Sequence, residues 1–139
     1  MTTAQPDIQL TPIGRVESSL TDPADAPKQA HEDAPQATLV FEPHVAAGLA
    51  GLRVGDEIML LTWLHRAARD VLRTHPRGDP ANPARGVFST RSPARPNPIG
   101  LHPVQIVAIE DCRIVVRHLE AVDGTPILDV KPVLVGWRA

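Results

Sequence analysis

Frequent interruption by prolines limits the possible folds of this sequence more than any other feature. The 139 residues include 15 prolines and 9 glycines, and each proline lacks a backbone N–H and fixes its φ angle. Between these interruptions lie short apolar segments bounded by turn residues, a pattern typical of an all-β domain. A helical bundle is therefore excluded, and the length and the ordinary apolar and charged fractions fit one globular domain.

Seven segments have the apolar character and flanking turns expected of strands. They are residues 8–16, 37–41, 57–64, 86–90, 104–109, 113–119 and 127–130. The runs within 58–61 and 104–109 are apolar on both faces, which fits a closed barrel with a second subunit packed outside it. The expected fold is all-β: a small closed or nearly closed β-barrel with one or two short helices, assembled as a homodimer. Residues 1–7 would form a tail and residues 8–139 a single domain.

Helical spacing occurs in two places. One or two helical turns are predicted by the spacing of Val45, Leu49 and Leu52. Residues 64–72 also match this period, but an Arg-Asp pair within them suits a hairpin turn equally well, so both alternatives stay open. The proline-rich stretches 22–35 and 74–83 are predicted loops.

Composition excludes several classes of protein. The four aromatic residues, Phe41, Trp63, Phe88 and Trp137, are too few for a nucleic-acid module built on rows of stacking rings. A single cysteine, Cys112, excludes an internal disulfide framework and a thiolate zinc cage, and the histidines lack metal-ligand spacing, so no metal is expected. The longest apolar run is far shorter than a membrane span and no signal peptide is visible, so the expected location is the cytoplasm, without a membrane partner.

Positive charge is concentrated in the middle third of the chain. Residues 1–50 carry 2 basic and 7 acidic side chains, residues 51–100 carry 8 and 4, and residues 101–139 carry 4 and 5. All of the basic residues in the middle third are arginines, whose planar forks suit carboxylates and phosphates. Either a solvated basic face or an anion-binding surface explains this block.

The most informative segment is residues 86–103, GVFSTRSPARPNPIGLHP. Its prolines make it a stiff loop, unsuited to a central strand, that holds Arg91, Arg95 and Asn97 in preset positions. Pre-organised donors suit recognition of a carboxylate or phosphate. The alternative is a rigid barrel corner whose arginines only cap backbone carbonyls. A second segment, residues 121–126 (AVDGTP), forms a tight turn that on its own fits a plain hairpin.

Together these segments resemble the TsaA-like family of S-adenosylmethionine-dependent tRNA methyltransferases. GVFSTRSPARPNPIG is followed by VDGTPILDVKP, and the match extends upstream to a Pro-Lys-Gln element and to a strand ending in Trp-Leu-His-Arg. The resemblance covers roughly residues 8–134. It implies a small β-barrel, a homodimer with the cofactor near the subunit interface, and methylation of N6 of threonylcarbamoyladenosine beside the tRNA anticodon.

The resemblance also implies which residues contact the cofactor. They are Pro27, Lys28, Gln29, His65, Arg66, Arg91, Leu101, Asp123, Gly124 and Thr125. Arg95 and Asn97 match the motif as structural or substrate-facing residues, and Asp123 or His65 is the candidate for the base that takes the N6 proton. Phosphate contacts along tRNA would fall on Arg53, Arg66, Arg69, Arg73, Arg77 and Arg85.

The sequence departs from the family at two points. Val133 stands where longer members have tyrosine, and those members continue into a C-terminal extension. The spacing of Gly48, Gly51 and Gly55 lacks the strand-loop-helix context of a dinucleotide site, so a Rossmann-type sheet is not expected. Two other functions stay open: methylation of a small molecule, and non-catalytic binding of S-adenosylmethionine or RNA.

Overall fold

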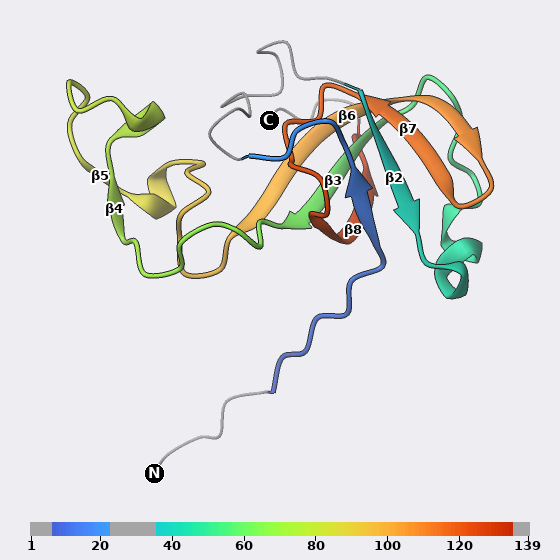
Figure 1. Cartoon of the computed structure of the whole chain (residues 1–139), viewed down its shortest axis with the longest axis horizontal. Coiled ribbons are helices and arrows are strands. Elements are labelled where there is room, and N and C mark those ends of the chain that lie inside the picture. Colours follow the sequence, from blue (N-terminus) through green and yellow to red (C-terminus); the bar gives the residue numbers. More distant parts are fainter. Residues whose placement is uncertain (1–6, 23–35, 135–139) are drawn as a thin grey trace.

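The computed structural model describes residues 7–22 and 36–134 (Figure 1). The strands are β1 (Gly14–Glu17), β2 (Ala37–Phe41), β3 (Glu57–Trp63), β4 (Arg73–Thr74), β5 (Arg85–Gly86), β6 (Ile99–Glu110), β7 (Arg113–Arg117) and β8 (Pro126–Pro132). The helical segments are all 3₁₀: η2 (Pro43–Leu49), η3 (Pro76–Gly78) and η4 (Val87–Ser89). The helical spacing predicted across residues 45–52 is thus confirmed as the 3₁₀ turns of η2, and no α-helix occurs in the described ranges.

Six of the strands close into a barrel in the order β1-β2-β7-β6-β3-β8, and all neighbouring pairs are antiparallel. The ring closes at β1, where Gly14 pairs with Phe41 of β2 on one side and with Ile127 of β8 on the other. This arrangement confirms the predicted all-β barrel. β4 and β5 form a separate two-stranded sheet outside it.

The barrel is filled by alternate side chains of its strands, because successive residues of a strand face opposite sides. Burial alternates in this way along β2 and along much of β6. The core includes Val16, Leu39, Phe41, Ile58, Leu60, Val104, Ile106, Ile114, Val116 and Ile127. Leu119 and Ala121, from the connection between β7 and β8, belong to the same core. That connection is therefore anchored in the barrel interior.

The strand predicted over residues 86–90 is wrong. The chain leaves β5 at Gly86 and turns into η4. The Ser89 hydroxyl donates to the Gly86 carbonyl at 2.8 Å, and the Thr90 hydroxyl donates to the Val87 carbonyl at 3.0 Å. Such local side-chain bonds compete with strand pairing and favour a turn.

The expectation that residues 86–103 exclude a central strand is wrong at their C-terminal end. β6 begins at Ile99 and includes Pro103, which lies opposite Met59 of β3. Pairing of β6 with β7 begins only at Gln105. Pro103 therefore lies where β6 has a strand on one side only, a position that tolerates a missing N–H.

Other element boundaries also differ from the predictions. Residues 64–72 form neither a helix nor a hairpin but a series of turns and bends. β1 begins at Gly14 rather than at residue 8. β7 ends at Arg117 because His118 has a φ of 71°, in the left-handed region, which a strand residue does not adopt.

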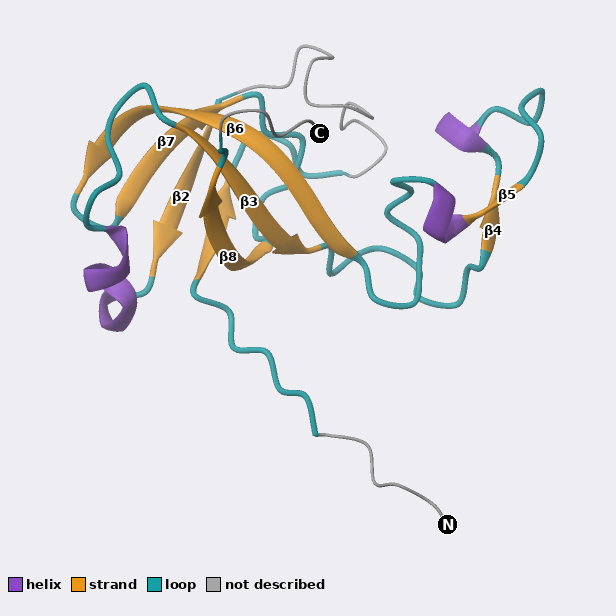
Figure 2. Cartoon of the chain, turned by 180° about the vertical axis from the view of Figure 1, so that it is seen from behind, coloured by secondary structure: helices purple, strands orange, loops and turns teal. Residues whose placement is uncertain are grey.

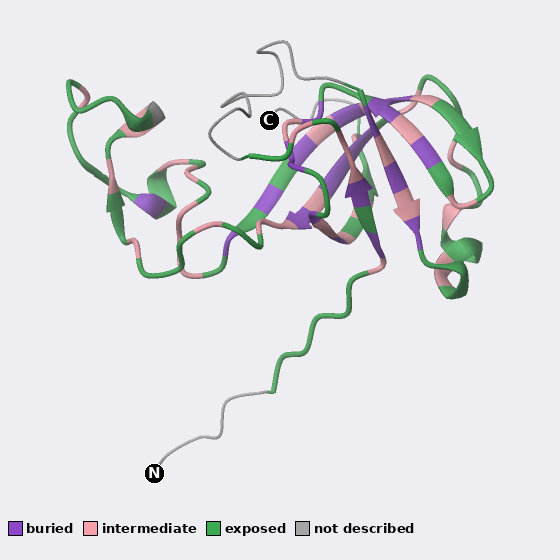
Figure 3. Cartoon of the chain, viewed as in Figure 1, coloured by how far each residue is buried: buried purple, intermediate pink, exposed green. Residues whose placement is uncertain are grey.

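Residues 64–98, here called the arm, extend to one side of the barrel and carry β4, β5, η3 and η4 (Figures 1 and 2). Figure 3 shows that exposed residues dominate the arm, whereas buried residues concentrate in the barrel. Val87 is fully buried in the arm, but Leu72 and Phe88 are 63% and 80% exposed. The arm thus displays apolar surface instead of enclosing it.

None of the helices among the described residues has the length and apolar character needed to cross a membrane.

Candidate functional site

The connection between β7 and β8 carries three of the predicted cofactor residues, Asp123, Gly124 and Thr125, and folds as a tight turn. Gly124 has a φ of 83°, which residues with a side chain rarely adopt. Thr125 is buried, and its hydroxyl donates to the carbonyl of Val122 at 2.7 Å. The plain hairpin considered from the sequence is wrong, because β7 and β8 are not neighbours in the barrel.

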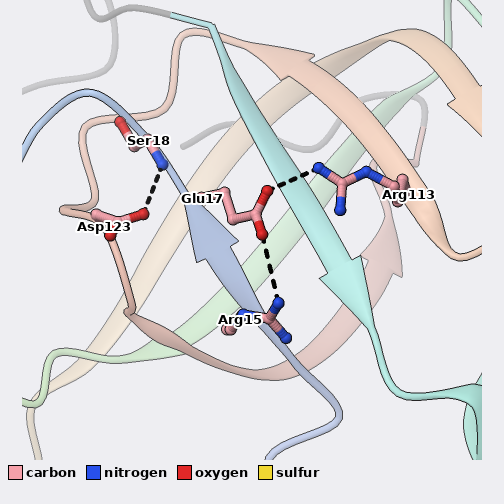
Figure 4. Close-up of polar contacts among 5 residues, drawn as sticks. All are labelled: Arg15, Glu17, Ser18, Arg113 and Asp123. Atoms are coloured by element: carbon pink, nitrogen blue, oxygen red, sulfur yellow. Dashed lines mark hydrogen bonds and ion pairs between the residues drawn. The ribbon is translucent and has the colours of Figure 1, made fainter.

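This turn, residues 121–125, is bound to the chain that leaves β1. The Asp123 amide donates to the Leu20 carbonyl at 2.6 Å, and the Gly124 amide donates to the Val16 carbonyl at 2.7 Å. The Ser18 amide in turn donates to Asp123 Oδ1 at 3.0 Å, as Figure 4 shows. These bonds fix the Asp123 carboxylate at the surface beside the end of β1.

An open pocket of about 680 Å³ lies beside this turn. Besides Asp123 and Gly124, its lining includes Arg15, Val16, Glu17, Ser18, Ser19, Gln36, Ala37, Thr38 and Val115. The volume falls within the range of about 300–1,000 Å³ that is usual for small-molecule sites. Carboxylate, hydroxyl, amide and guanidinium groups line it, so it suits a polar ligand that carries both charges.

Two arginines flank a carboxylate at this pocket. Glu17 of β1 accepts from Arg113 of β7 at 2.7 Å and from Arg15 at 3.3 Å, and Figure 4 shows Glu17 between them. The Glu17 side chain is 39% exposed, and those of Arg15 and Arg113 are 52% and 51% exposed. Because solvent screens ion pairs this exposed, the two pairs contribute little to the stability of the fold. The two ion pairs instead restrict the side-chain positions of Arg15 and Glu17, which line the pocket.

His65 and Arg66 follow β3 at the base of the arm, and both are exposed. The Arg66 guanidinium donates to the carbonyl of Thr21, so it joins the base of the arm to the segment that follows β1. Leu101 lies on β6 opposite Leu61 and is 37% exposed. Arg66 is therefore linked to the segment that carries Ser18 and Ser19, while His65 has no hydrogen bond or ion pair with any described residue.

Arg91 lies in the arm and is exposed, without a hydrogen bond or ion pair to any described residue. It does not line the pocket that contains Asp123. The structure of the single chain thus brings together Asp123, Gly124 and Thr125 but leaves Arg91 apart from them. Pro27, Lys28 and Gln29 lie outside the described residues.

Arg95 and Asn97 are engaged within the arm. The Arg95 guanidinium donates to the carbonyls of Val87 and Thr90, the latter at 2.8 Å, and its amide donates to the Ala68 carbonyl at 3.1 Å. These contacts are those of an arginine that caps carbonyls at a rigid corner. Asn97 accepts from Arg69 at 3.1 Å.

Several residues at the site were not identified from the sequence. Ser18, Ser19 and Gln36 line the pocket, but short polar residues beside a loop gave no signal of a ligand site. Arg69 was expected to contact phosphate, yet it also donates to the Pro96 carbonyl at 2.8 Å and lies 5.1 Å from the centre of the Trp63 ring. It fastens the two ends of the arm to each other.

The family model for the tRNA-methyltransferase O N-terminal domain matches residues 15–136. The chain belongs to this family. The predicted resemblance is thereby confirmed, and the match spans both the barrel and the arm.

Relatives of this tRNA-methyltransferase O family member are named for S-adenosylmethionine. A "probable S-adenosyl-L-methionine-binding protein" of Methanothermobacter thermautotrophicus is 40% identical over 126 residues, covering 91% of this chain and 90% of the relative. An "S-adenosyl-L-methionine-binding protein" of Archaeoglobus fulgidus is 44% identical over 123 residues, covering 88% of this chain and 86% of the relative.

A solved structure has the same fold. The crystal structure of TrmO from Pseudomonas aeruginosa superimposes with a TM-score of 0.74 at 29% identity and covers 92% of this chain. The chain spans 56% of that protein.

Proposed function

We propose that this protein is an S-adenosylmethionine-dependent methyltransferase that acts on N6 of threonylcarbamoyladenosine beside the tRNA anticodon. The observation that carries the proposal is the position of Asp123 and Gly124 in the lining of the 680 Å³ pocket, in a chain of the tRNA-methyltransferase O family. The names of the two archaeal relatives support the choice of cofactor. On this proposal residues 8–139 act as one methyltransferase domain, preceded by a tail.

The residues present fit the chemistry of this cofactor. Its ribose hydroxyls and ammonium group need acceptors, which Asp123 and Glu17 provide at the pocket. Its carboxylate needs a cation, and a guanidinium binds carboxylate with two parallel hydrogen bonds. Arg91 is the proposed partner, with Lys28, His65, Arg66, Leu101 and the remaining residues implied by the family resemblance completing the site. When bound, S-adenosylmethionine supplies an electrophilic methyl group on a positively charged sulfur.

The work left to the chain is alignment, exclusion of water and removal of one proton. In-line displacement gains most of its rate when the attacking atom is held at the right distance and angle. Asp123 and His65 are the candidates for taking the N6 proton, and Asp123 has the stronger geometric support because it lines the pocket. We expect replacement of the base to slow the single-turnover rate while leaving cofactor affinity closer to that of the wild type.

A homodimer would bring Arg91 to a cofactor site. The arm contains a small two-stranded sheet of the kind that is marginally stable on its own, and its Leu72 and Phe88 are exposed. The outer face of β6 presents Leu101 beside exposed Ile99. We propose that the arm of one copy packs against a second copy, so that Arg91 completes the site near the subunit interface.

The arm is also the proposed tRNA-binding surface. Residues 64–98 contain 7 arginines and 2 aspartates, so the arm concentrates the positive charge of the chain. Arg66, Arg69, Arg73, Arg77, Arg85 and, on the barrel, Arg53 would contact phosphates. Such contacts predict binding that weakens steeply with salt.

Incubation with methyl-labelled S-adenosylmethionine tests the proposal. We expect label to appear in N6-methylated threonylcarbamoyladenosine when tRNA from a strain lacking this methylation is supplied, and not with tRNA lacking the threonylcarbamoyl group. Transfer that persists without tRNA would identify a small-molecule methyltransferase instead. Tight binding of the cofactor without transfer to any tRNA would identify a binding module.

A further inference from the structure

A chain of hydrogen bonds runs through the barrel interior beside the proposed site. Thr62 Oγ1 on β3 lies 2.7 Å from His102 Nε2 on β6, and His102 Nδ1 lies 2.6 Å from Oε1 of Glu120. Thr62 is fully buried, the His102 side chain is 4% exposed and the Glu120 side chain is 18% exposed. The sequence predicted no metal-ligand role for His102, and it singled out neither Thr62 nor Glu120.

The position opposite Thr62 is a glycine, which leaves room for these bonds. Gly100 lies opposite Thr62 in the β3–β6 ladder. A Cβ at Gly100 would lie 2.4 Å from Thr62 Oγ1 and 2.5 Å from His102 Nε2. The space that a side chain at this position requires is therefore occupied by the Thr62–His102 bond.

The atom order of hydroxyl, imidazole and carboxylate is that of a hydrolytic triad, but the setting differs. A nucleophile must reach a substrate, and Thr62 is completely enclosed in the barrel. None of the three residues lines the described pocket. The chain of bonds therefore acts on other parts of the protein and not on a substrate.

Each of the three residues lies close in sequence to a proposed cofactor residue. Thr62 precedes His65 by three positions, His102 follows Leu101, and Glu120 precedes Asp123 by three positions. Glu120 ties the start of the 121–125 turn to β6 and through it to β3, while Asp123 and Gly124 bind the opposite side of the turn to residues 16–20. The turn is thus held from both sides.

We propose that Thr62, His102 and Glu120 are positioning residues, which hold the 121–125 turn in the conformation that binds S-adenosylmethionine. This inference rests on the proposed function. Glu120 Oε2 is buried and has no hydrogen-bond partner among the described residues. A buried polar group of this kind is costly, and apolar side chains of similar volume often stabilise such a location equally well or better. If these three residues served only to stabilise the fold, apolar side chains would do so equally well or better.

The two roles predict different behaviour when these residues are replaced by apolar ones. The variant Thr62→Val/His102→Leu/Glu120→Leu replaces the chain of bonds by apolar contacts, and Glu120→Ala removes only its last member. Calorimetric titration with S-adenosylmethionine measures affinity, thermal unfolding measures stability, and hydrogen exchange of the cofactor-free protein measures the order of residues 121–125. The control is Glu110→Gln, which makes a carboxylate-to-amide change at the exposed far end of β6.

We expect both variants to bind the cofactor about tenfold more weakly, the size of coupling typical of residues in one network. Amide exchange across 121–125 should rise in both, while the triple variant keeps a melting temperature near that of the wild type and Glu110→Gln changes nothing. Glu120→Gln, which retains an oxygen that accepts from His102, should recover most of the affinity. The double variant Glu120→Ala/Asp123→Ala should lose less binding free energy for S-adenosylmethionine than the sum of the losses in the two single variants.

A folded triple variant with wild-type affinity and unchanged exchange would overturn the proposal, as would additive losses in the double variant. If the triple variant does not fold, Glu120→Ala and Glu120→Gln decide by the same measurements. Failure of the wild type to bind S-adenosylmethionine would instead remove the proposed function. Exchange at 121–125 would then still show whether these residues order the turn.

Discussion

At the scale of single residues, Gly100 and Gly124 are required for different physical reasons. Gly124 has open space around it, but its φ of 83° places a side-chain residue in a strained backbone conformation. At Gly100 the obstacle is contact, because an added Cβ meets Thr62 and His102. The first requirement is local to a turn, and the second depends on a tertiary contact between two strands.

Gly100→Ala should destabilise the protein by about 1–3 kcal/mol, because overpacking of a core forces neighbouring side chains to shift. Gly48→Ala is the matched control, since a Cβ built there has no heavy atom within 4 Å apart from its chain neighbours and the backbone of its own helix. Chemical denaturation measures both free energies of unfolding. Equal stabilities of the two variants would contradict the contacts described at Gly100.

Arg91→Ala should weaken binding of S-adenosylmethionine by about 1.5–3 kcal/mol, the usual contribution of a hydrogen bond to a charged group. Arg117→Ala, at the exposed end of β7, removes the same charge away from the site and should leave affinity unchanged. Calorimetric titration compares them. Unchanged affinity in Arg91→Ala would show that this arginine does not hold the cofactor.

Residue chemistry in the sequence identified the arginines of the proline-rich segment but did not separate their roles. Arg91 and Arg95 occupy the same motif, yet Arg95 is bonded to Val87 and Thr90 whereas Arg91 extends from the arm without such partners. The distinction depends on where two carbonyls lie after folding. For the same reason the contacts that His102 makes with Thr62 of β3 and with Glu120 of the β7–β8 connection could not be predicted from the sequence.

At the scale of elements, the arm depends on side-chain bonds to its own backbone more than on packing. Arg95 caps the η4 turn, and Arg69 joins the arm's two ends through Pro96 and Asn97. Among the described side chains of the arm, the buried apolar residues are Val87 and Pro98, so the arm gains little from the hydrophobic effect. Its order therefore depends on a few polar contacts.

Arg95→Ala should loosen the arm while leaving the barrel intact. Loss of its charged hydrogen bonds costs about 1.5–3 kcal/mol of local stability, which should raise amide exchange in residues 87–95 by about tenfold or more. Exchange in β2 and β7 should not change. Arg85→Ala, an exposed arginine of the same arm, serves as control, and equal protection in both variants would contradict the capping role.

Strand predictions were correct where buried and exposed side chains alternate along the barrel. They were wrong where side chains form hydrogen bonds with the nearby backbone. Residues 37–41 match β2 at both ends because an inward and an outward face alternate there. Residues 86–90 have the same apolar appearance, but the hydroxyls of Ser89 and Thr90 bind the backbone in place of a neighbouring strand. Pro103 was misjudged because its tolerance depends on where β7 ends beside β6, a tertiary fact absent from the local pattern.

At the scale of the whole molecule, the barrel and the arm carry complementary parts of the proposed site. The barrel contributes the turn with Asp123 and the pocket beside β1 and β2, and the arm contributes Arg91 and much of the positive charge. The closed barrel was predictable from short, alternating strands. The projection of the arm away from it was not, because loop residues give no signal of direction.

Phe88→Asp should convert the proposed dimer into a monomer, since a charge replaces an 80% exposed ring at the expected interface. Light scattering should give about twice 15.0 kDa for the wild type and 15.0 kDa for the variant. Because the dimer completes the proposed cofactor site, cofactor affinity should fall when the dimer is lost. Val54→Asp, an exposed apolar residue outside the arm, is the control, and a wild type that is monomeric at micromolar concentration would contradict the assembly.

The pairing of β1 with β8 also governs how this chain can fold. Gly14 and Ile127 meet in the ladder that closes the ring, so the barrel cannot be completed while the ribosome still holds β8. Sequence-distant pairing of this kind raises the contact order and slows folding. A nascent chain stalled before residue 126 would leave the edges of β1 and β3 that pair with β8 unpaired, and open strand edges of this kind favour association with other chains.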